Sequence, residues 1–176
     1  MHINNLSKFY FINKFKKNNI DKIPNNTAII YRNYENKNNI NEIIKIRFYC
    51  RKKKIKFFLS NNFKLALKLG LDGAYIPSFN INFRHLSYKI PKKFKILGSA
   101  HNLKEIKIKE LQNIEEIFLS PLFKEKTNKQ LNIYKYLKLR EITKMRDISL
   151  GGINNQNIKK LYMIKPFGFA GISYFE

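Results

Sequence analysis

Eight short apolar runs recur along the chain, and this pattern constrains the fold more than any other feature of the sequence. Each run has the length of a buried strand, and stretches with helical periodicity lie between several of them. The strand candidates are Phe9–Ile12, Ala28–Tyr31, Ile55–Leu59, Gly73–Ile76, Lys95–Gly98, Glu116–Leu119, Ile148–Gly151 and Phe169–Ser173. The helix candidates are Asn41–Arg51, Phe63–Leu69, Leu103–Leu111, Leu131–Met145 and Asn157–Ile164. The chain therefore alternates between strand and helix over most of its length.

The strand candidates lack a clean alternation of apolar and polar residues. This indicates burial on both faces, as in a parallel sheet covered by helices. Eight such alternations favour an α/β fold of the (β/α)8 TIM barrel type over a doubly wound sheet. The chain has 176 residues, whereas such barrels usually have roughly 250. We therefore expect one compact barrel domain over residues 1–176, with short helices and without the last outer helix.

Composition excludes several classes of protein. The chain is 44% hydrophobic and has 15 Phe and 10 Tyr, so it can fill a core and global disorder is not expected. Cys50 is the only cysteine, which excludes a disulfide scaffold and favours a reducing compartment. No stretch approaches the roughly 20 apolar residues of a membrane span, and the N-terminus lacks a secretory signal core. We expect a soluble, cytoplasmic protein.

The formal net charge of +23 predicts attraction to polyanions or phosphorylated ligands. Codon bias explains the same excess without any selected partner, because Lys, Asn, Ile, Phe and Tyr, whose codons are A/T-rich, are abundant. The basic run at 51–54 lies near aromatic residues, as nucleic-acid-binding surfaces require. It also suits a solvated helix end. Charge alone therefore leaves the partner open.

Two segments near the C-terminus are candidate phosphate-binding loops. Gly151 and Gly152 follow the seventh apolar run, where paired glycines let backbone N–H groups approach an anion and a following helix start adds its dipole. Ile172 and Ser173 end the eighth run, where the serine can donate its hydroxyl and its backbone N–H. The loops after strands seven and eight are the common phosphate site of TIM barrels. A tight turn without a ligand is the alternative.

His101 is the candidate for proton transfer, because it follows the fifth apolar run. Residues at the carboxyl ends of barrel strands are commonly catalytic, and histidine carries protons near neutral pH. A solvent-facing or helix-capping histidine is the alternative. We predict no metal site, because hard cations need clustered carboxylates and the strand ends carry Asn61 and Asn80 instead. A single cysteine also leaves no Cys/His cluster for zinc.

Six segments carry a further pattern. They are Phe58–Leu67, Gly70–Ile76, Ile96–Glu105, Leu119–Thr127, Ser149–Asn154 and Gly168–Ser173. In order and spacing they resemble the motifs of the thiamine-phosphate synthase / TenI-like family, a set of small (β/α)8 proteins of thiamine biosynthesis. The resemblance extends over nearly the whole chain and implies the same fold.

The two branches of this family imply different chemistry. Synthases join a pyrimidine diphosphate to a thiazole phosphate with magnesium, and their two magnesium aspartates fall here on Asn61 and Asn80. TenI-like proteins lack the diphosphate and magnesium residues, and the studied type tautomerises a thiazole carboxylate phosphate. Their acid/base histidine, in the motif S-x-H, falls on His101, and Tyr75–Ser78 resembles their motif QLPS. The resemblance is therefore closer to the TenI-like branch.

The resemblance implies a protein that binds a thiazole phosphate and needs no cofactor. His101 would be catalytic, and the residues implied for the substrate and its phosphate are Arg32, Ser99, Thr127, Gly151, Gly152, Ile172 and Ser173. One alternative is a divergent synthase that uses magnesium. Another is a non-catalytic binder of a phosphorylated metabolite or of RNA. Because the missing outer helix would expose apolar barrel surface, a homodimer is a further expectation.

Overall fold

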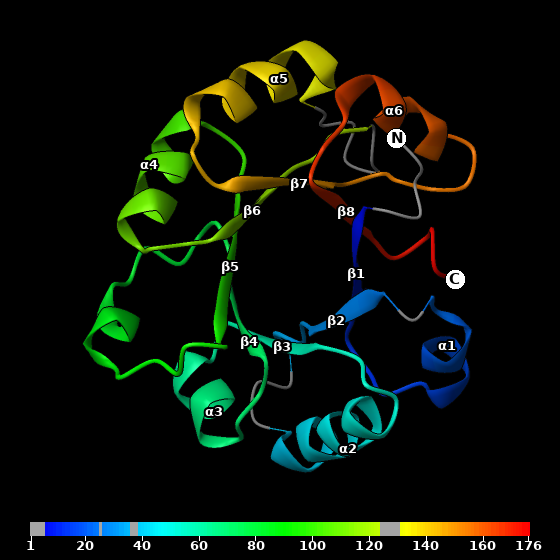
Figure 1. Cartoon of the computed structure of the whole chain (residues 1–176), viewed down its shortest axis with the longest axis vertical. Helices are drawn as coiled ribbons and strands as arrows, with labels where there is room; N and C mark the ends of the chain where they lie inside the picture. Colours follow the sequence, from blue (N-terminus) through cyan, green and yellow to red (C-terminus); the bar gives the residue numbers. More distant parts are fainter. Residues whose placement is uncertain (1–5, 25, 36–38, 124–130) are drawn as a thin grey trace.

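All eight predicted strands form one closed parallel barrel (Figure 1). The computed structural model describes residues 6–24, 26–35, 39–123 and 131–176. The strands are β1 (Ser7–Ile12), β2 (Thr27–Tyr31), β3 (Phe57–Ser60), β4 (Gly73–Ile76), β5 (Lys95–Ala100), β6 (Glu116–Leu119), β7 (Arg146–Leu150) and β8 (Gly168–Gly171). Each strand pairs with the next, and β8 pairs with β1 to close the ring. The prediction of a (β/α)8 TIM barrel is confirmed.

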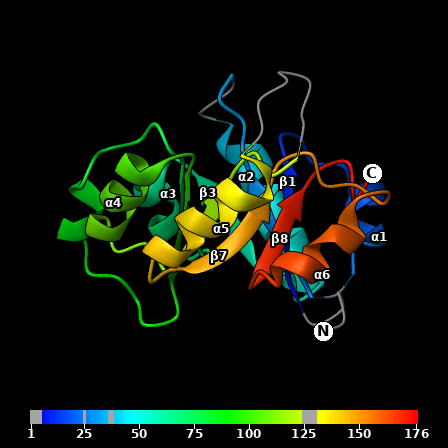
Figure 2. The ribbon, with the colours of Figure 1, turned by 90° about the horizontal axis from the view of Figure 1, so that it is seen from above.

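The helices form the outer layer of the barrel (Figure 1). They are α1 (Lys17–Lys22), α2 (Ile40–Lys52), α3 (Phe63–Lys68), α4 (Leu103–Leu111), α5 (Asn132–Ile142) and α6 (Leu161–Ile164). Figure 2 shows α5 and α6 lying beside β7 and β8. Between β4 and β5 the chain forms only a 3-10 turn, Arg84–Ser87. These short helices and one missing α-helix explain how the barrel closes with so few residues.

The interior of the barrel is filled with side chains from all eight strands. The ring of Phe118 lies at its centre and makes edge contacts with Phe9, Phe11 and Tyr75, at centroid distances of 5.0, 5.9 and 5.3 Å. Such perpendicular arrangements are favourable for aromatic pairs. The barrel therefore has a solid aromatic core, and ligands have access only to its ends.

The residues after β8, 172–176, form a turn that packs back onto the barrel. The rings of Tyr174 and Phe175 contact Phe169 at 5.0 and 6.1 Å, and Phe175 also contacts Tyr10 at 5.2 Å. The Tyr10 hydroxyl donates to Glu176 Oε1 at 3.0 Å. Tyr10 and Phe169 are thereby buried. The apolar surface that we expected to be exposed beside β1 and β8 is therefore covered by the chain itself.

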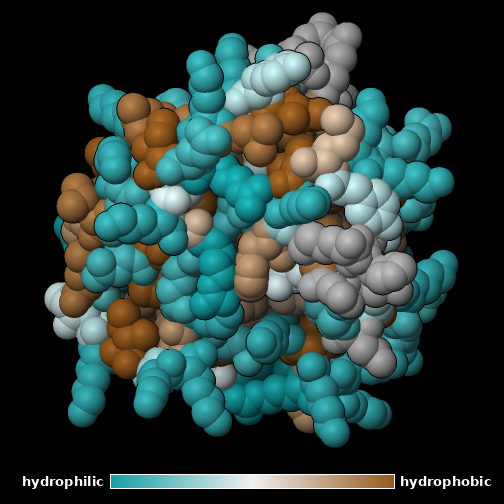
Figure 3. Space-filling model, turned by 45° about the horizontal axis from the view of Figure 1, so that its top comes forward, coloured by the Kyte–Doolittle hydropathy of each residue, from teal (hydrophilic) through white to brown (hydrophobic). Residues whose placement is uncertain are grey.

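The outer surface is mainly hydrophilic, with separate apolar patches on the face seen in Figure 3. The basic run 51–54 is exposed at the end of α2. Within it, Arg51 donates to the Gly70 carbonyl at 3.2 Å, and Lys53 pairs with Asp21 at 2.7 Å. Among the residues described, no helix combines the length and the apolar character needed to cross a membrane.

Candidate active site

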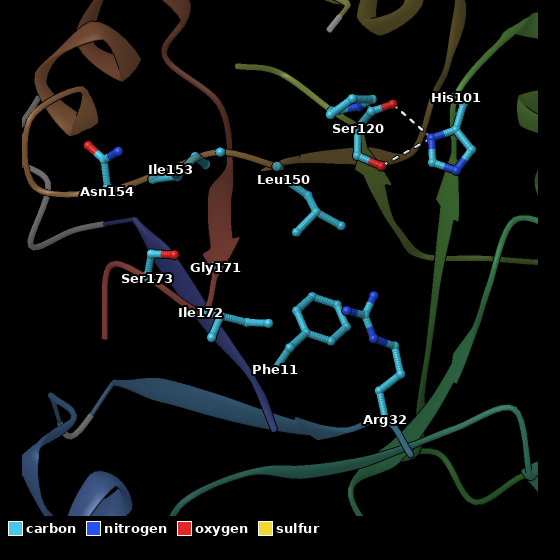
Figure 4. A pocket seen from close by; sticks show the side chains of 13 residues that line it. Phe11, Arg32, His101, Ser120, Leu150, Ile153, Asn154, Gly171, Ile172 and Ser173 are labelled. Carbon is cyan, nitrogen blue, oxygen red and sulfur yellow. Dashed lines mark hydrogen bonds between the residues drawn. The ribbon is translucent and has the colours of Figure 1, made fainter. Parts of the chain in front are cut away.

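A pocket of about 600 Å³ opens at the carboxyl ends of the strands (Figure 4). Its lining brings together six of the residues predicted from the sequence, namely Arg32, His101, Gly151, Gly152, Ile172 and Ser173. The other lining residues are Phe11, Ser120, Pro121, Leu150, Ile153, Asn154 and Gly171. None of these described lining residues is acidic. Because Arg32 contributes a permanent positive charge, the pocket favours an anionic ligand.

Two predicted site residues are not part of this lining. Ser99 lies in β5 and is buried, and its Oγ accepts a hydrogen bond from the backbone N of Ser78 at 3.0 Å. It therefore holds a neighbouring loop and does not face the pocket. Thr127 lies outside the described residues.

The glycine turn after β7 has the backbone geometry that the sequence suggested. Gly151 and Gly152 have φ angles of 99° and 67°, a region in which most residues with a side chain are strained. The Gly151 carbonyl accepts from the backbone N of Phe123 at 3.1 Å, and the Gly152 carbonyl accepts from Asn157 Nδ2 at 2.7 Å. Both carbonyl groups are thus directed toward protein donors. With no side chains on this turn, a ligand can approach its backbone closely.

The short helix predicted at Asn157–Ile164 begins one residue later, as a 3-10 turn at Ile158, and ends at Ile164 as predicted. Only its last four residues, α6, are α-helical. Asn154 Oδ1 accepts from the backbone N of Asn157, and Asn157 Oδ1 accepts from the backbone N of Asn154. These asparagines satisfy the backbone themselves and delay the helix. The dipole that we expected from this helix start is therefore small, because the α-helical part has only four residues.

His101 is held by hydrogen bonds at both ring nitrogens. Its Nδ1 lies 2.8 Å from the carbonyl oxygen of Ser120 and 3.1 Å from Ser120 Oγ (Figure 4). Its Nε2 lies 3.1 Å from Ser78 Oγ. Because a carbonyl oxygen can only accept, Nδ1 carries the proton in the neutral ring, and Nε2 has the free electron pair. In the neutral ring, Nε2 is therefore an acceptor, and the Ser78 hydroxyl donates to it.

The alternative role for His101, as a helix cap, is filled by its neighbour. The side chain of Asn102 accepts from the backbone N of Glu105 at 3.0 Å and so caps α4. The Glu105 carboxylate in turn accepts from the backbone N of His101, one residue before the cap, at 2.7 Å, and from Asn102 Nδ2 at 2.9 Å. The His101 ring is therefore not engaged in the cap.

Arg32 and Phe11 form the side of the pocket next to β1 and β2. The guanidinium carbon of Arg32 lies 4.6 Å from the centroid of the Phe11 ring, which is a cation–π contact. Figure 4 shows the two side chains next to each other, across the pocket from the glycine turn.

The phenol of Tyr75 lies buried in the barrel core, and burial raises its pKa to about 12. Its hydroxyl therefore stays protonated at neutral pH.

The analysis of the sequence missed three residues of this arrangement: Phe11, Ser78 and Ser120. All three lie at or just after the carboxyl end of a strand. Their position at a strand end could have identified these residues, because the loops after barrel strands form the site. Their residue types could not, since serine and phenylalanine are common in turns and cores.

Asn61 and Asn80, the positions to which the resemblance assigns magnesium ligands, bind each other. Asn80 Nδ2 donates to Asn61 Oδ1 at 2.7 Å, and Asn80 Oδ1 accepts from the backbone N of Asn82 at 2.9 Å. Neutral amides that satisfy one another do not fit magnesium, which requires carboxylate or phosphate oxygens. Over the described ranges, no group of three or more His, Cys, Asp or Glu side chains could hold a metal ion either.

Comparisons with known proteins identify the family of this chain. The family model described as thiamine monophosphate synthase (TMP-TENI) matches residues 22–175. The chain is 30% identical over 143 residues to the thiamine-phosphate synthase of Pelagibacter ubique, a match that covers 77% of this chain and 68% of that protein. It is 26% identical over 155 residues to the thiamine-phosphate synthase of a Hydrogenobaculum species, covering 84% and 71% respectively.

A solved structure shows the same fold. The thiamine phosphate pyrophosphorylase from Pyrococcus furiosus superimposes with a TM-score of 0.74 and covers 98% of this chain and 88% of its own. The barrel architecture is therefore shared although the two sequences are only 20% identical.

Proposed function

The chain belongs to the thiamine monophosphate synthase family, and from this premise we propose that it binds one phosphorylated thiazole and moves a proton on it. One observation carries the proposal. His101, Arg32 and the Gly151–Gly152 turn line a single pocket in which no described residue is acidic. The anion-binding and proton-transferring groups therefore meet at one ligand-sized cavity, as a tautomerase requires.

The glycine turn and Ser173 are the proposed phosphate site. The left-handed backbone at Gly151 and Gly152 allows a phosphate oxygen to approach main-chain N–H groups. Ser173 adds a hydroxyl and Ile172 adds apolar contact at the same end of the pocket. Arg32, on the opposite side, would bind a second negative group such as a carboxylate. Ser99 would act indirectly, by holding the loop that carries Ser78.

His101 is the proposed acid/base. The carbonyl of Ser120 fixes the proton on Nδ1, so that Nε2 is the basic nitrogen. Once the Ser78 hydroxyl that donates to it turns aside, Nε2 would accept a proton from one ligand atom and return it to another. No other histidine is among the residues that line this pocket. A reaction of this kind needs one ligand and no metal.

The other half of the barrel mouth supports a reaction with one ligand. Tyr34 bridges it, since its hydroxyl lies 3.2 Å from Ser60 Oγ and its ring contacts Phe79 at 5.6 Å. Together with the Asn61–Asn80 hydrogen bond, these contacts link the loops after β2, β3 and β4 over the end of β3. The 600 Å³ pocket accordingly has no lining residue from β3 or β4. This half of the mouth has its own smaller cavity of about 260 Å³, whose described lining residues include Asn61 and Asn80 but no carboxylate that could hold the magnesium ion of a diphosphate.

A divergent synthase is the second candidate, and the names of the relatives favour it. It predicts that the chain releases diphosphate from a pyrimidine diphosphate when thiazole phosphate and magnesium are present. The tautomerase proposal predicts no diphosphate under these conditions. A coupled diphosphate assay with both substrates separates the two candidates.

Calorimetric titration with thiazole phosphate and with thiamine phosphate tests the proposed site. We expect saturable binding to the wild-type chain, and loss of binding in Gly152→Asp. The matched control is Gly70→Asp, because Gly70 also has a positive φ and does not line the pocket. Binding that survives in Gly152→Asp would overturn the assignment of the phosphate site. No heat at millimolar ligand with the wild-type chain would overturn the proposed function.

Turnover tests the role of His101. With a thiazole carboxylate phosphate as substrate, we expect His101→Ala to lower kcat by about 100-fold or more, because a positioned acid/base contributes at least this much. His85→Ala is not a suitable control, because His85 is buried and bonds the Gln112 carbonyl. Asn102→Ser is suitable, since serine also caps helices and places no second negative charge beside Glu105. Unchanged turnover in His101→Ala would remove the catalytic assignment.

A further inference from the structure

We propose that the segment between β4 and β5, residues 77–94, docks the protein reversibly onto a membrane surface that carries anionic lipids. The segment presents an apolar patch to solvent, and patches of this kind mark interaction sites. Five side chains form the patch, with these exposed fractions: Phe79 62%, Ile81 63%, Phe83 42%, Leu86 40% and Tyr88 38%. None of the five lines the pocket of the proposed function. Docking would therefore not depend on the ligand of that pocket.

The fold explains why this patch is exposed. Between β4 and β5, the 3-10 turn Arg84–Ser87 takes the place of an outer α-helix. Figure 1 shows this turn at the outer edge of the barrel, between α3 and α4. An amphipathic helix would direct its apolar side chains toward the strands, whereas this irregular segment leaves five of them in solvent.

The backbone beneath the patch is held by buried polar side chains at the end of α4. The Asn80 carbonyl accepts from Lys109 Nζ at 2.8 Å. The carbonyls of Asn80 and Asn82 each accept from Gln112 Nε2 at 2.9 Å. Lys109 and Gln112 are fully buried, so a rearrangement that turned Ile81 inward would leave their donors unpaired, at a high cost. The patch therefore stays exposed and is available to a partner.

The charges of the segment select an anionic partner. Residues 73–104 contain no Asp or Glu. Four basic side chains of the segment are exposed, namely Arg84, Lys89, Lys92 and Lys93. Basic side chains next to apolar ones are attracted to the surface of a membrane that contains anionic lipids. A second copy of this chain is a poor partner by comparison, because it also carries a net charge of +23.

The types of apolar side chain favour lipid over nucleic acid. Single-stranded nucleic acids stack their bases on aromatic rings, and Ile81 and Leu86 have no ring. Aliphatic and phenyl side chains gain free energy when they enter the acyl region, and tyrosine suits the interface between lipid and water. The patch therefore has the composition of a surface that inserts its apolar side chains while its cations contact the lipid headgroups.

Binding to vesicles tests the proposal. We expect the chain to cosediment with vesicles of phosphatidylcholine and phosphatidylglycerol in equal parts, and much less with vesicles of phosphatidylcholine alone. Ile81→Ser with Phe83→Ser should weaken this binding by about tenfold or more, because both side chains lose their transfer into the acyl region. The matched control is Ile44→Ser with Phe48→Ser, which removes the same two residue types from α2, where they are 43% and 73% exposed. Equal binding by the two double variants would overturn the proposal.

A second measurement reports insertion at a single position. The chain contains no tryptophan, so Phe83→Trp introduces the only indole. We expect its fluorescence to shift to shorter wavelength when the anionic vesicles are added, because the indole leaves water. Phe48→Trp on α2 should show no such shift. A Phe83→Trp spectrum that is the same with and without vesicles would overturn the proposal.

The same variants identify the other occupants that this patch could have. Single-stranded RNA at the patch would change the Phe83→Trp fluorescence when a uridine oligonucleotide is added, with no response to vesicles. A second copy of the chain would appear as a dimer in sedimentation equilibrium, and Ile81→Ser with Phe83→Ser would dissociate it. Either result without binding to the anionic vesicles would replace the lipid assignment.

Discussion

The side chains of Asn61 and Asn80 are joined by a 2.7 Å hydrogen bond across the ends of β3 and β4. Asn61 has a φ of 57°, a left-handed conformation that asparagine tolerates better than most residues. Its backbone N donates to the Tyr75 carbonyl at 2.9 Å. The bond thus ties two loops together at the place where the resemblance puts a magnesium ion.

The double variant Asn61→Asp with Asn80→Asp is expected to create a weak magnesium site. Two carboxylates at this distance repel each other, and a divalent cation relieves the repulsion while it satisfies their oxygens. The measurement is a calorimetric titration with magnesium chloride. The control is Asn62→Asp with Asn82→Asp, which adds the same charge next to the pair. Equal magnesium binding in the wild-type chain would contradict this account of the asparagines.

Gly73 and Gly171 are expected to respond very differently to alanine. A Cβ at Gly73 would overlap the backbone carbonyl of Lys95 and would lie 2.7 Å from the ring of Phe58, whereas at Gly171 the nearest atom is 3.6 Å away. We expect Gly73→Ala to cost about 3 kcal/mol in the free energy of unfolding, because the strands must separate. Gly171→Ala should change it by less than about 1 kcal/mol. Urea denaturation measures both, and equal values would contradict the close approach of β4 and β5.

Tyr136→Phe is expected to destabilise the fold without affecting the pocket. The buried Tyr136 hydroxyl donates to Asp147 Oδ2 and accepts from Ser149 Oγ, both at 2.9 Å, and so joins α5 to β7. Its removal leaves buried polar atoms without a partner, at a cost of about 1–3 kcal/mol. Tyr134→Phe is the matched control, because that side chain is 81% exposed on the same helix. Urea denaturation should separate the two variants, and a loss of ligand affinity in Tyr136→Phe would contradict a purely structural role.

The strands could be predicted from the sequence because a strand that is buried on both faces consists mainly of apolar residues. Gly73–Ile76 has no charged residue and Glu116–Leu119 has only Glu116 at its start, and the structure has the same bounds for both strands. Helix α1 was not predicted, since Ile20 is its only buried residue and a single apolar position has no period. The end of β5 was placed too early, because pairing with β6 extends the strand through small residues to Ala100.

The candidate site was predictable only in part, for a related reason. His101 and the Gly151–Gly152 turn directly follow strands, and residues at the carboxyl ends of barrel strands commonly form the active site. Their position in the sequence was therefore enough to predict them. Ser78 and Ser120 act on His101 because two loops meet beside β5, and the sequence separates these serines from His101 by 23 and 19 residues. Contacts of this kind depend on the closed barrel and have no local pattern.

Lys109 is fully buried. Burial lowers the pKa of its ammonium group from 10.5 to about 8. Its Nζ donates to the Asn80 carbonyl and to Gln112 Oε1, both at 2.8 Å, and neither partner carries a charge. Between pH 8 and 10.5 the unfolded chain binds more protons at this side chain than the folded chain does. The free energy of unfolding therefore rises with pH across this window, by about 3 kcal/mol from this group alone, and the gain is lost as pH falls through 8.

Lys109→Met isolates this contribution, because methionine fills a similar volume and does not titrate. Urea denaturation of both chains at pH 7.5, 9 and 10.5 gives the difference in free energy of unfolding at each pH. Other titrating groups, such as Cys50, whose pKa burial raises to about 12, affect both chains equally and cancel in this difference. We expect the wild-type chain to gain stability relative to Lys109→Met as pH rises. A difference that stays constant over this range would mean that Lys109 keeps its ordinary pKa, and that the loop carrying Ser78 and Asn80 is held by a fully charged ammonium group.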